Sequence, residues 1–192
     1  QKFSHLDESI YLYRGLTYSL NFPKLPLGLC IFRDDQIFFV MESNGEIIYQ
    51  QSLPLAPRLL FETMKDVQNP IGYISKIRKD IISTLKSIQW PYRPRFLICQ
   101  GLDVSVLTSL IIPSNNVTKS QIHGFKLTRG HLRNIIDHLL LHPNDVSLQD
   151  TIYPNRSFTC IITAVCIEEI ATHSMRDSIM VSSGSLLLGK VL

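Results

Sequence analysis

The sequence is poor in charge: Asp, Glu, Lys and Arg make up 18% of its 192 residues, and the formal net charge is +3. Its Lys and Arg residues are scattered, with no run of five, which argues against a nucleic-acid-binding surface. No apolar stretch approaches the length of a membrane span, and no signal peptide is recognisable. We therefore expect a cytoplasmic protein that binds neither nucleic acid nor membrane. The low charge also leaves apolar surface free to contact a partner.

The cysteines form no C-x-x-C pair, which excludes the usual thiol-based metal and redox motifs. There are four, Cys30, Cys99, Cys160 and Cys166, and all lie within apolar runs. This pattern predicts buried free thiols in a reducing compartment. A chain of this length buries roughly 70% of its unfolded surface, so it needs no disulfide, metal or cofactor to fold.

The chain also lacks internal repeats, low-complexity segments and linkers, so we expect residues 1–192 to form a single domain. The sequence begins with Gln1, and we expect it to be a piece of a longer protein. Hydrophobic periodicity predicts helices and strands in a mixed order. The expected helices cover 7–20, 57–64, 71–90, 103–112 with an Asp103 cap, 128–142 and 156–174. The expected strands cover 27–32, 36–42, 46–53, 95–100 and 177–182.

This order of elements predicts an α/β fold with a mixed sheet. Three consecutive strands form an antiparallel meander, and Asn44-Gly45 between the second and third is a strong hairpin signal. The later strands join in parallel through helical crossovers. The segment 156–174 is apolar nearly all round, so it should be a central, buried helix.

Two adjacent acids, Asp34 and Asp35, lie in the turn between the first two predicted strands. Carboxylates at a hairpin tip could ligate a cation. The favoured interpretation is a type I turn whose Asp side chains hydrogen-bond to backbone groups.

Histidines offer a second possible metal cluster. His131, His138 and His142 lie on one predicted helix, and the last two, with Asp137, are spaced to bind zinc. The favoured interpretation is surface histidines near a helix C-terminus, where a positive charge is stabilised. No metal site is therefore expected.

A serine cluster near the end of the chain could supply a nucleophile. It consists of Ser182, Ser183 and Ser185. Activation of a serine requires an adjacent base, and the sequence shows none nearby. The favoured interpretation is a polar loop.

Six segments, in fixed order along nearly the whole chain, resemble the exopolyphosphatase / guanosine pentaphosphate phosphohydrolase (Ppx/GppA) family of the actin-like ATPase superfamily. They are "SHLDESIYLYRGLTYSL", "GEIIYQQSLPLAPRLLFE", "FLICQGLDVSVLTSL", "FKLTRGHLRNIIDHLL", "NRSFTCIITAVCIEEI" and "DSIMVSSGSLLLGKVL". The resemblance implies a ribonuclease-H-like, actin-like ATPase lobe. It also implies that this chain is the second, C-terminal lobe of a two-lobe phosphatase and that the first lobe is absent.

The family's phosphate-binding motif in this lobe, "DxGGGSxE", is degraded here. In that motif glycines let backbone N–H groups approach phosphate oxygens. The aligned positions are Cys30 for the first acid, Phe32, Arg33 and Asp34 for the glycines, Asp35 for the serine and Ile37 for the last acid. Bulky and acidic side chains at these positions should obstruct and repel phosphate.

The other phosphate-contacting motifs are degraded as well. The family's "GGT" turn falls on Gly101, Leu102 and Asp103, so one glycine survives and an acid is introduced. The arginine and glutamate of the late "GlREG" motif are leucines within 185–189. Arg156, in the position of the family's "RAd", remains as a possible anion-binding residue.

Two functions follow from this resemblance. The first is a non-catalytic interaction or regulatory domain, a pseudoenzyme that kept the fold and lost the phosphate cradle. Its partners would be its own missing N-terminal lobe, another protein or a second copy. The alternative is a Mg-dependent phosphoanhydride hydrolase, acting on polyphosphate or guanosine pentaphosphate together with that missing lobe.

Overall fold

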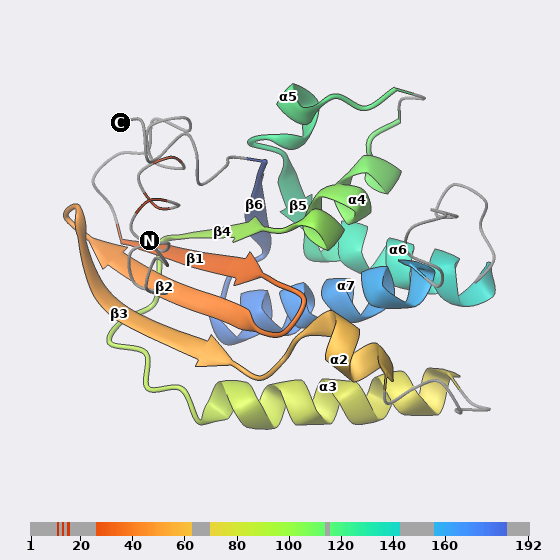
Figure 1. Ribbon diagram of the computed structural model, residues 1–192, viewed down its shortest axis with the longest axis horizontal. Coiled ribbons are helices and arrows are strands. Elements are labelled where there is room, and N and C mark those ends of the chain that lie inside the picture. Colours follow the sequence, from red (N-terminus) through yellow and green to blue (C-terminus); the bar gives the residue numbers. More distant parts are fainter. Residues whose placement is uncertain are drawn as a thin grey trace, which may run out of the picture.

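The computed structural model describes residues 11, 13, 15, 26–62, 70–113, 116–142 and 156–183, without the side chains of 61, 62, 70, 156 and 157. Figure 1 shows one curved sheet with helices gathered along it. No helix in these ranges combines the length and apolarity needed to cross a bilayer.

The sheet has six strands in the spatial order β3-β2-β1-β4-β6-β5. The strands β1, β2 and β3 form the expected antiparallel meander. β4 pairs parallel with β1, β6 pairs parallel with β4, and β5 pairs antiparallel with β6. The strands are β1 (Leu27–Phe32), β2 (Ile37–Ser43), β3 (Glu46–Leu53), β4 (Phe96–Gln100), β5 (Lys126–Thr128) and β6 (Ser178–Ser182). The mixed α/β sheet predicted from the sequence is confirmed.

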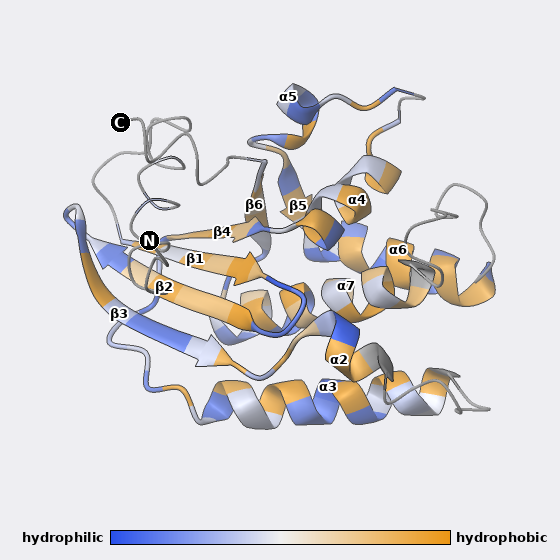
Figure 2. Cartoon of the chain, in the orientation of Figure 1, coloured by the Kyte–Doolittle hydropathy of each residue, from blue (hydrophilic) through white to orange (hydrophobic). Residues whose placement is uncertain are grey.

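The hairpin between β2 and β3 has the conformation that Asn-Gly favours. Asn44 has φ 56° and Gly45 has φ 88°, as a type I′ turn requires at both central positions. Figure 2 shows long hydrophobic stretches on β1, β2 and β4, whereas β3 is mixed. Strands covered on both faces read as continuous apolar runs, so β1 and β2 belong to the centre of the sheet.

Six helices accompany the sheet in the described ranges, and α7 is the central one. They are α2 (Pro57–Glu62), α3 (Pro70–Lys86), α4 (Leu102–Ile111), α5 (Lys119–Ile122), α6 (Arg129–Leu141) and α7 (Arg156–His173). α7 packs against α2, α3, α4 and α6. Its described side chains are buried almost throughout its length, as its apolar sequence predicts.

Two hydrophobic clusters lie on opposite faces of the sheet. The larger contains alternate residues of the strands, such as Phe39 and Met41, packed with α3, α4, α6 and α7. The smaller contains the intervening residues, such as Phe38 and Val40, with Tyr13 packed against them. The period-two alternation of each strand therefore places half of its side chains in each cluster.

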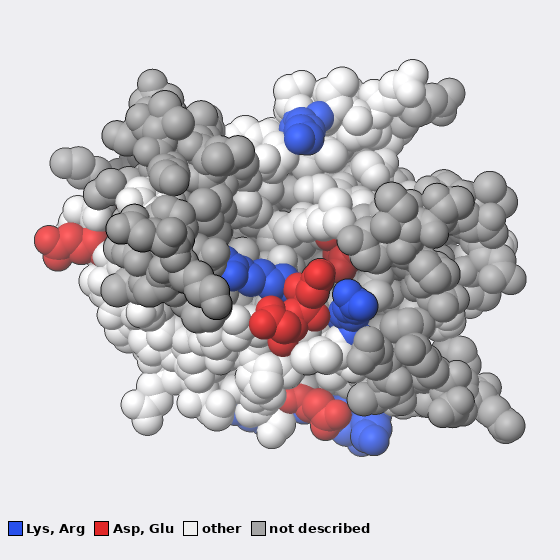
Figure 3. Space-filling view, viewed as in Figure 1, with Lys and Arg blue, Asp and Glu red and all other residues white. Residues whose placement is uncertain are grey.

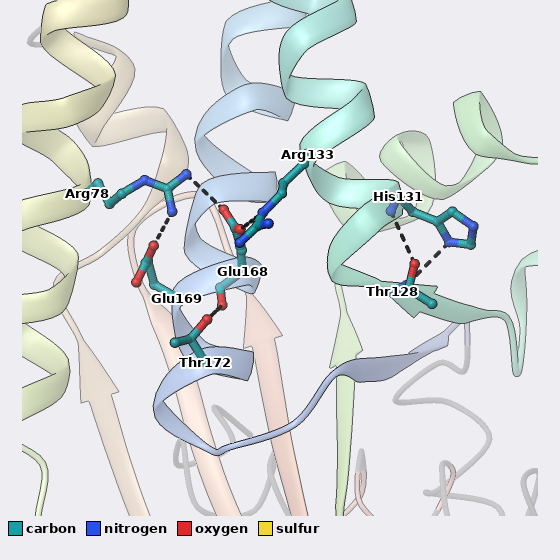
Figure 4. A network of polar contacts seen from close by, with 7 residues as sticks. All are labelled: Arg78, Thr128, His131, Arg133, Glu168, Glu169 and Thr172. Carbon is teal, nitrogen blue, oxygen red and sulfur yellow. Dashed lines mark hydrogen bonds and ion pairs between the residues drawn. The ribbon is translucent and has the colours of Figure 1, made fainter.

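Charged side chains on three helices are joined through two buried acids of α7 (Figure 4). Glu168 accepts from Arg78 of α3 and Arg133 of α6, each at 2.8 Å, and Arg78 also pairs with Glu169. Burial by itself raises the pKa of Glu168, but the hydrogen bonds and charges of the two arginines outweigh it and lower that pKa. The network fixes α3 and α6 against α7.

Several local expectations were wrong. α3 ends at Lys86 rather than near Trp90, and Ile71 in its first turn is 68% exposed. The N-cap of α4 is Gly101, and Asp103 lies inside the first turn. β5 and α5 were not expected at all. The predicted helix 7–20, apart from residues 11, 13 and 15, and the segment 184–192 lie outside the described residues.

Candidate functional site

The positions aligned with the family's phosphate-binding motifs lie at one end of the sheet. The strands β1, β4 and β6 are parallel, so their carboxyl ends lie at the same end of the sheet. Phe32 ends β1 and Gly101 follows β4. A Cβ added to Gly101 would lie 2.8 Å from both the Cβ and the carbonyl oxygen of Phe32. The two degraded turns are therefore in direct backbone contact. The side chain of Phe32 is buried in the larger core cluster, so its backbone lines this contact and its ring does not.

The turn from β1 to β2 is a closed two-residue hairpin. The Arg33 N–H donates to the carbonyl of Gln36 at 3.0 Å. Asp34 and Asp35 occupy the tip, both exposed, and neither has positive φ. This backbone fits the predicted type I turn, which most residues can adopt. The turn thus presents carboxylates at a position where the resemblance called for bare amides.

Charges of both signs gather at this turn. Figure 3 shows acidic side chains at the tip of the β1–β2 turn, flanked by basic side chains. Asp34 lies 3.9 Å from Arg58 in the first turn of α2, with 85% of its side chain exposed. A pair so exposed contributes little to stability, because solvent screens it. The pair nevertheless partly neutralises Arg58, a positive charge that would otherwise be available to an anionic ligand.

The N-terminus of α4 is the second part of the site. Helix N-termini attract anions through free N–H groups and the helix dipole. Asp103 lies in the first turn of α4, where its carboxylate gains that same stabilisation. Leu102, 60% exposed, stands beside it at the position of a family glycine. The helix end therefore carries its own anion and an apolar side chain.

The serine cluster has a histidine neighbour that sequence reasoning missed. Ser182 ends β6, and its Oγ lies 3.4 Å from Nδ1 of His123. The Ser183 N–H donates to the same nitrogen at 3.3 Å. The lone pair that a general base needs is thus occupied, and Ser182 is fully buried. The contact ties the end of β6 to the residue after α5, which are far apart in sequence.

The described residues hold no group of three or more His, Cys, Asp and Glu side chains placed to bind a metal ion. The rings of His138 and His142 contact each other in a tilted arrangement, with their centroids 5.0 Å apart, at the end of α6. Their closeness reflects the i, i+4 spacing that the sequence predicted.

Arg156, the possible anion-binding remnant, is the first residue of α7. Its side chain lies outside the description, so the prediction for this residue stays open. Of the remaining predicted positions, Phe32 places its side chain in the larger core cluster. Arg33, Asp34, Asp35, Gly101, Leu102 and Asp103 converge at the carboxyl end of β1 and β4.

Protein-family profiles and characterised proteins give no match to this sequence. Solved structures do match in fold. A Ppx/GppA family member from Aquifex aeolicus has a TM-score of 0.83 at 17% identity, over 98% of this chain and 62% of that one. An exopolyphosphatase-like protein has 0.79 at 16%, over 98% and 66%. An exopolyphosphatase from Cytophaga hutchinsonii has 0.70 at 15%, over 97% and 62%.

The chain therefore has an α/β fold of the actin-like ATPase type. More narrowly, it shares the fold of Ppx/GppA and exopolyphosphatase structures, as the sequence motifs implied. It spans less than two thirds of the length of each of these proteins.

Proposed function

We propose that this chain is a non-catalytic interaction or regulatory domain that is exopolyphosphatase-like in fold and has no working phosphate cradle. The observation that carries the proposal is the charge at the two turns. Asp34, Asp35 and Asp103 bring three carboxylates to positions where a phosphate chain would need donors, against Arg33 and Arg58. Polyanions bind where positive charge is in excess, so this arrangement disfavours them.

The one glycine that survives has a reason unrelated to phosphate. Gly101 has φ 152°, and any side chain there would collide with the Phe32 backbone. The fold itself therefore demands glycine at this position. Its presence adds no support for a retained phosphate site.

The same end of the sheet is suited to contact with protein. Leu102 is exposed beside a mixed set of charges, and such surfaces are more typical of protein contacts than of polyphosphate channels. The occupant that we propose is a first lobe of the kind that the resemblance implies, or a separate regulatory protein.

Isothermal titration calorimetry tests the proposal, with polyphosphate, guanosine pentaphosphate and ATP as ligands in the presence of Mg²⁺. We expect no binding at micromolar concentrations. The triple variant Asp34→Asn/Asp35→Asn/Asp103→Asn should bind polyphosphate measurably more tightly than the native chain, because it removes the local repulsion. The control Asp80→Asn/Asp137→Asn/Asp177→Asn changes net charge equally at exposed positions elsewhere and should leave binding unchanged.

Micromolar binding by the native chain would contradict the proposal. Phosphate release by a longer protein that contains this chain would favour the hydrolase instead. Loss of that release in Arg156→Ala, but not in Asp35→Ala, would then identify the remaining functional residue.

A further inference from the structure

The end of α6 carries two exposed histidines one helical turn apart. His138 lies in the last turn, and His142 is the C-cap residue. The amide of His142 donates to the carbonyl oxygen of His138 at 2.9 Å, so the backbone keeps the helical i, i+4 relation although His142 itself has φ −128° and ψ 63°. Side chains with this spacing lie on the same face of a helix, one above the other.

The two imidazole rings have a separation that suits a shared metal ion. Their centroids are 5.0 Å apart, and their planes are inclined at 48°. If one nitrogen of each ring lies about 2.1 Å from a zinc-sized ion, each centroid lies about 3.2 Å from that ion. Two such centroids are about 4.5 Å apart at a ligand angle of 90° and about 5.2 Å apart at the tetrahedral angle. The observed separation lies between these values, so rotation of the exposed rings is sufficient to direct both at one ion.

The charges around this helix end favour a cation. The last turn of α6 contains no lysine or arginine, and Arg133, farther back on the helix, is paired with Glu168. The carbonyl groups at a helix C-terminus carry a partial negative charge, which stabilises a cation bound there. Asp137, next to His138 in the chain and exposed, adds a full negative charge.

The ligand type decides which ions can bind. Zn²⁺, Ni²⁺ and Cu²⁺ accept imidazole nitrogen readily, whereas Mg²⁺ and Ca²⁺ prefer oxygen ligands. Within the ranges that the structure describes, no third His, Cys, Asp or Glu side chain completes a metal-binding group with this pair. The remaining coordination positions of the ion would therefore be filled by water, as in an open site from which the metal can exchange.

We propose that His138 and His142 form a surface chelate site for one divalent late transition-metal ion, namely Zn²⁺, Ni²⁺ or Cu²⁺. Figure 1 shows α6 extending away from the sheet, so its far end is separate from the turns that follow β1 and β4. The site is consequently independent of the phosphate-binding positions. A bound ion links the C-cap residue to the preceding turn and thereby stabilises the end of the helix.

Isothermal titration calorimetry of the untagged 192-residue chain with NiCl₂ or ZnCl₂ tests the site. We expect one ion per chain, bound with micromolar affinity. His138→Gln and His142→Gln should each weaken binding by about tenfold or more, because a single imidazole has no chelate effect. The matched control His131→Gln changes a histidine of the same helix about 10 Å from His138 and should bind normally. Glutamine at that position can still form the capping box with Thr128.

Moving one histidine tests the spacing. In the His142→Gln background, Asn134→His creates an i, i+4 pair with His138 and should restore binding. Gly130→His in the same background adds the same side chain about 12 Å from His138 along the helix and should not restore it. Both replaced residues are exposed, so neither change introduces a histidine into the core.

Electron paramagnetic resonance of the chain loaded with one equivalent of Cu²⁺ counts the nitrogen ligands independently. The native chain should show hyperfine coupling to two imidazole nitrogens, and each single variant should show one at most. The four cysteines are buried, so thiolates do not compete for the ion in the folded chain.

Three results would overturn the proposal. The first is a native chain that binds neither Ni²⁺ nor Zn²⁺ at millimolar concentration. The second is a double variant, His138→Gln/His142→Gln, that binds either ion as tightly as the native chain, since the site must then lie elsewhere. The third is restoration of binding by Gly130→His but not by Asn134→His, which would show that the helical spacing does not determine affinity.

Discussion

Gly101 illustrates how a single residue can be retained for a reason that a motif comparison does not reveal. In the resemblance it is the surviving glycine of a phosphate turn. In the structure it is the point where the turn after β4 meets the backbone at the end of β1. Both its φ of 152° and its lack of a side chain are needed there.

Alanine substitutions at three glycines separate these two requirements. Gly101→Ala should lower the free energy of unfolding by about 3 kcal/mol, because the backbone strain of its positive φ and the steric overlap with Phe32 are additive. Gly45→Ala, with positive φ and open space, should lose about 1 kcal/mol. Gly130→Ala, near the start of α6 and without such overlap, should gain up to about 1 kcal/mol. Urea denaturation measures all three, and equal losses at Gly101 and Gly45 would contradict the steric account.

For a single residue, the hardest feature to predict from the sequence was a contact with a residue far away along the chain. Both degraded turns were aligned with phosphate-contacting motifs, and the structure brings them into contact at Phe32 and Gly101. The contact between Ser182 and His123 was missed because 59 positions separate them and no local signal links them. Asp103 was expected as a cap, but the backbone reaches its helical conformation one residue earlier, at Leu102, and Gly101 becomes the cap.

The helices are coupled chiefly through α7, and Glu168 is the polar centre of that coupling. Its side chain is 3% exposed and pairs with one arginine from α3 and another from α6. Removing one partner of a buried ion pair leaves the others uncompensated. Both arginines reach solvent in part, which reduces that penalty.

Glu168→Gln should lower the free energy of unfolding by about 2 kcal/mol at neutral pH. The isosteric control Asp137→Asn, on the exposed face of α6, should change it by less than about 0.5 kcal/mol. Because the folded-state pKa of Glu168 is lowered, its contribution is complete above the ordinary carboxyl value near 4.5 and is lost as the pH falls through the folded-state pKa. The difference between native chain and variant, measured by urea denaturation, should therefore be constant from pH 5 to 7 and shrink below pH 4.5. A difference that grows in acid would contradict this assignment.

Elements with strong local patterns were predictable, and those stabilised by distant partners were not. The apolar spacing of α3 and α7 and the Asn-Gly turn gave the right structures because local and tertiary preferences agree there. β5 has three residues and forms only by pairing with β6, about 50 positions later. Its sequence alone therefore carries no strand signal.

At the scale of the whole molecule, all four cysteines are buried, so their reactivity reports whether the core is accessible to solvent. Cys30 and Cys99 lie opposite each other on β1 and β4, and Cys160 and Cys166 lie on α7. Burial raises the pKa of Cys99 and of Cys166, so little reactive thiolate is present. All four positions were predicted to be buried, and they are.

A thiol reagent such as DTNB should consequently label none of the four cysteines of the native chain within minutes at neutral pH. In guanidinium chloride it should label all four rapidly. At intermediate guanidinium chloride concentrations, the labelling rate of Cys30 and Cys99 reports opening of the whole sheet, because these residues lie in its central strands. Rapid labelling of one thiol in native buffer would show that part of this core opens separately.

The position of β6 has a consequence for synthesis on the ribosome. This strand is inserted between β4 and β5, yet it comes from residues 178–182, after all the other described elements. A nascent chain that has emerged only as far as α7 can close the meander and add β4, but β5 has nothing to pair with. The exposed side of β4 is then an open hydrophobic template for as long as translation of the last segment takes. Chaperone binding to stalled chains should therefore fall sharply once Ser182 leaves the exit tunnel.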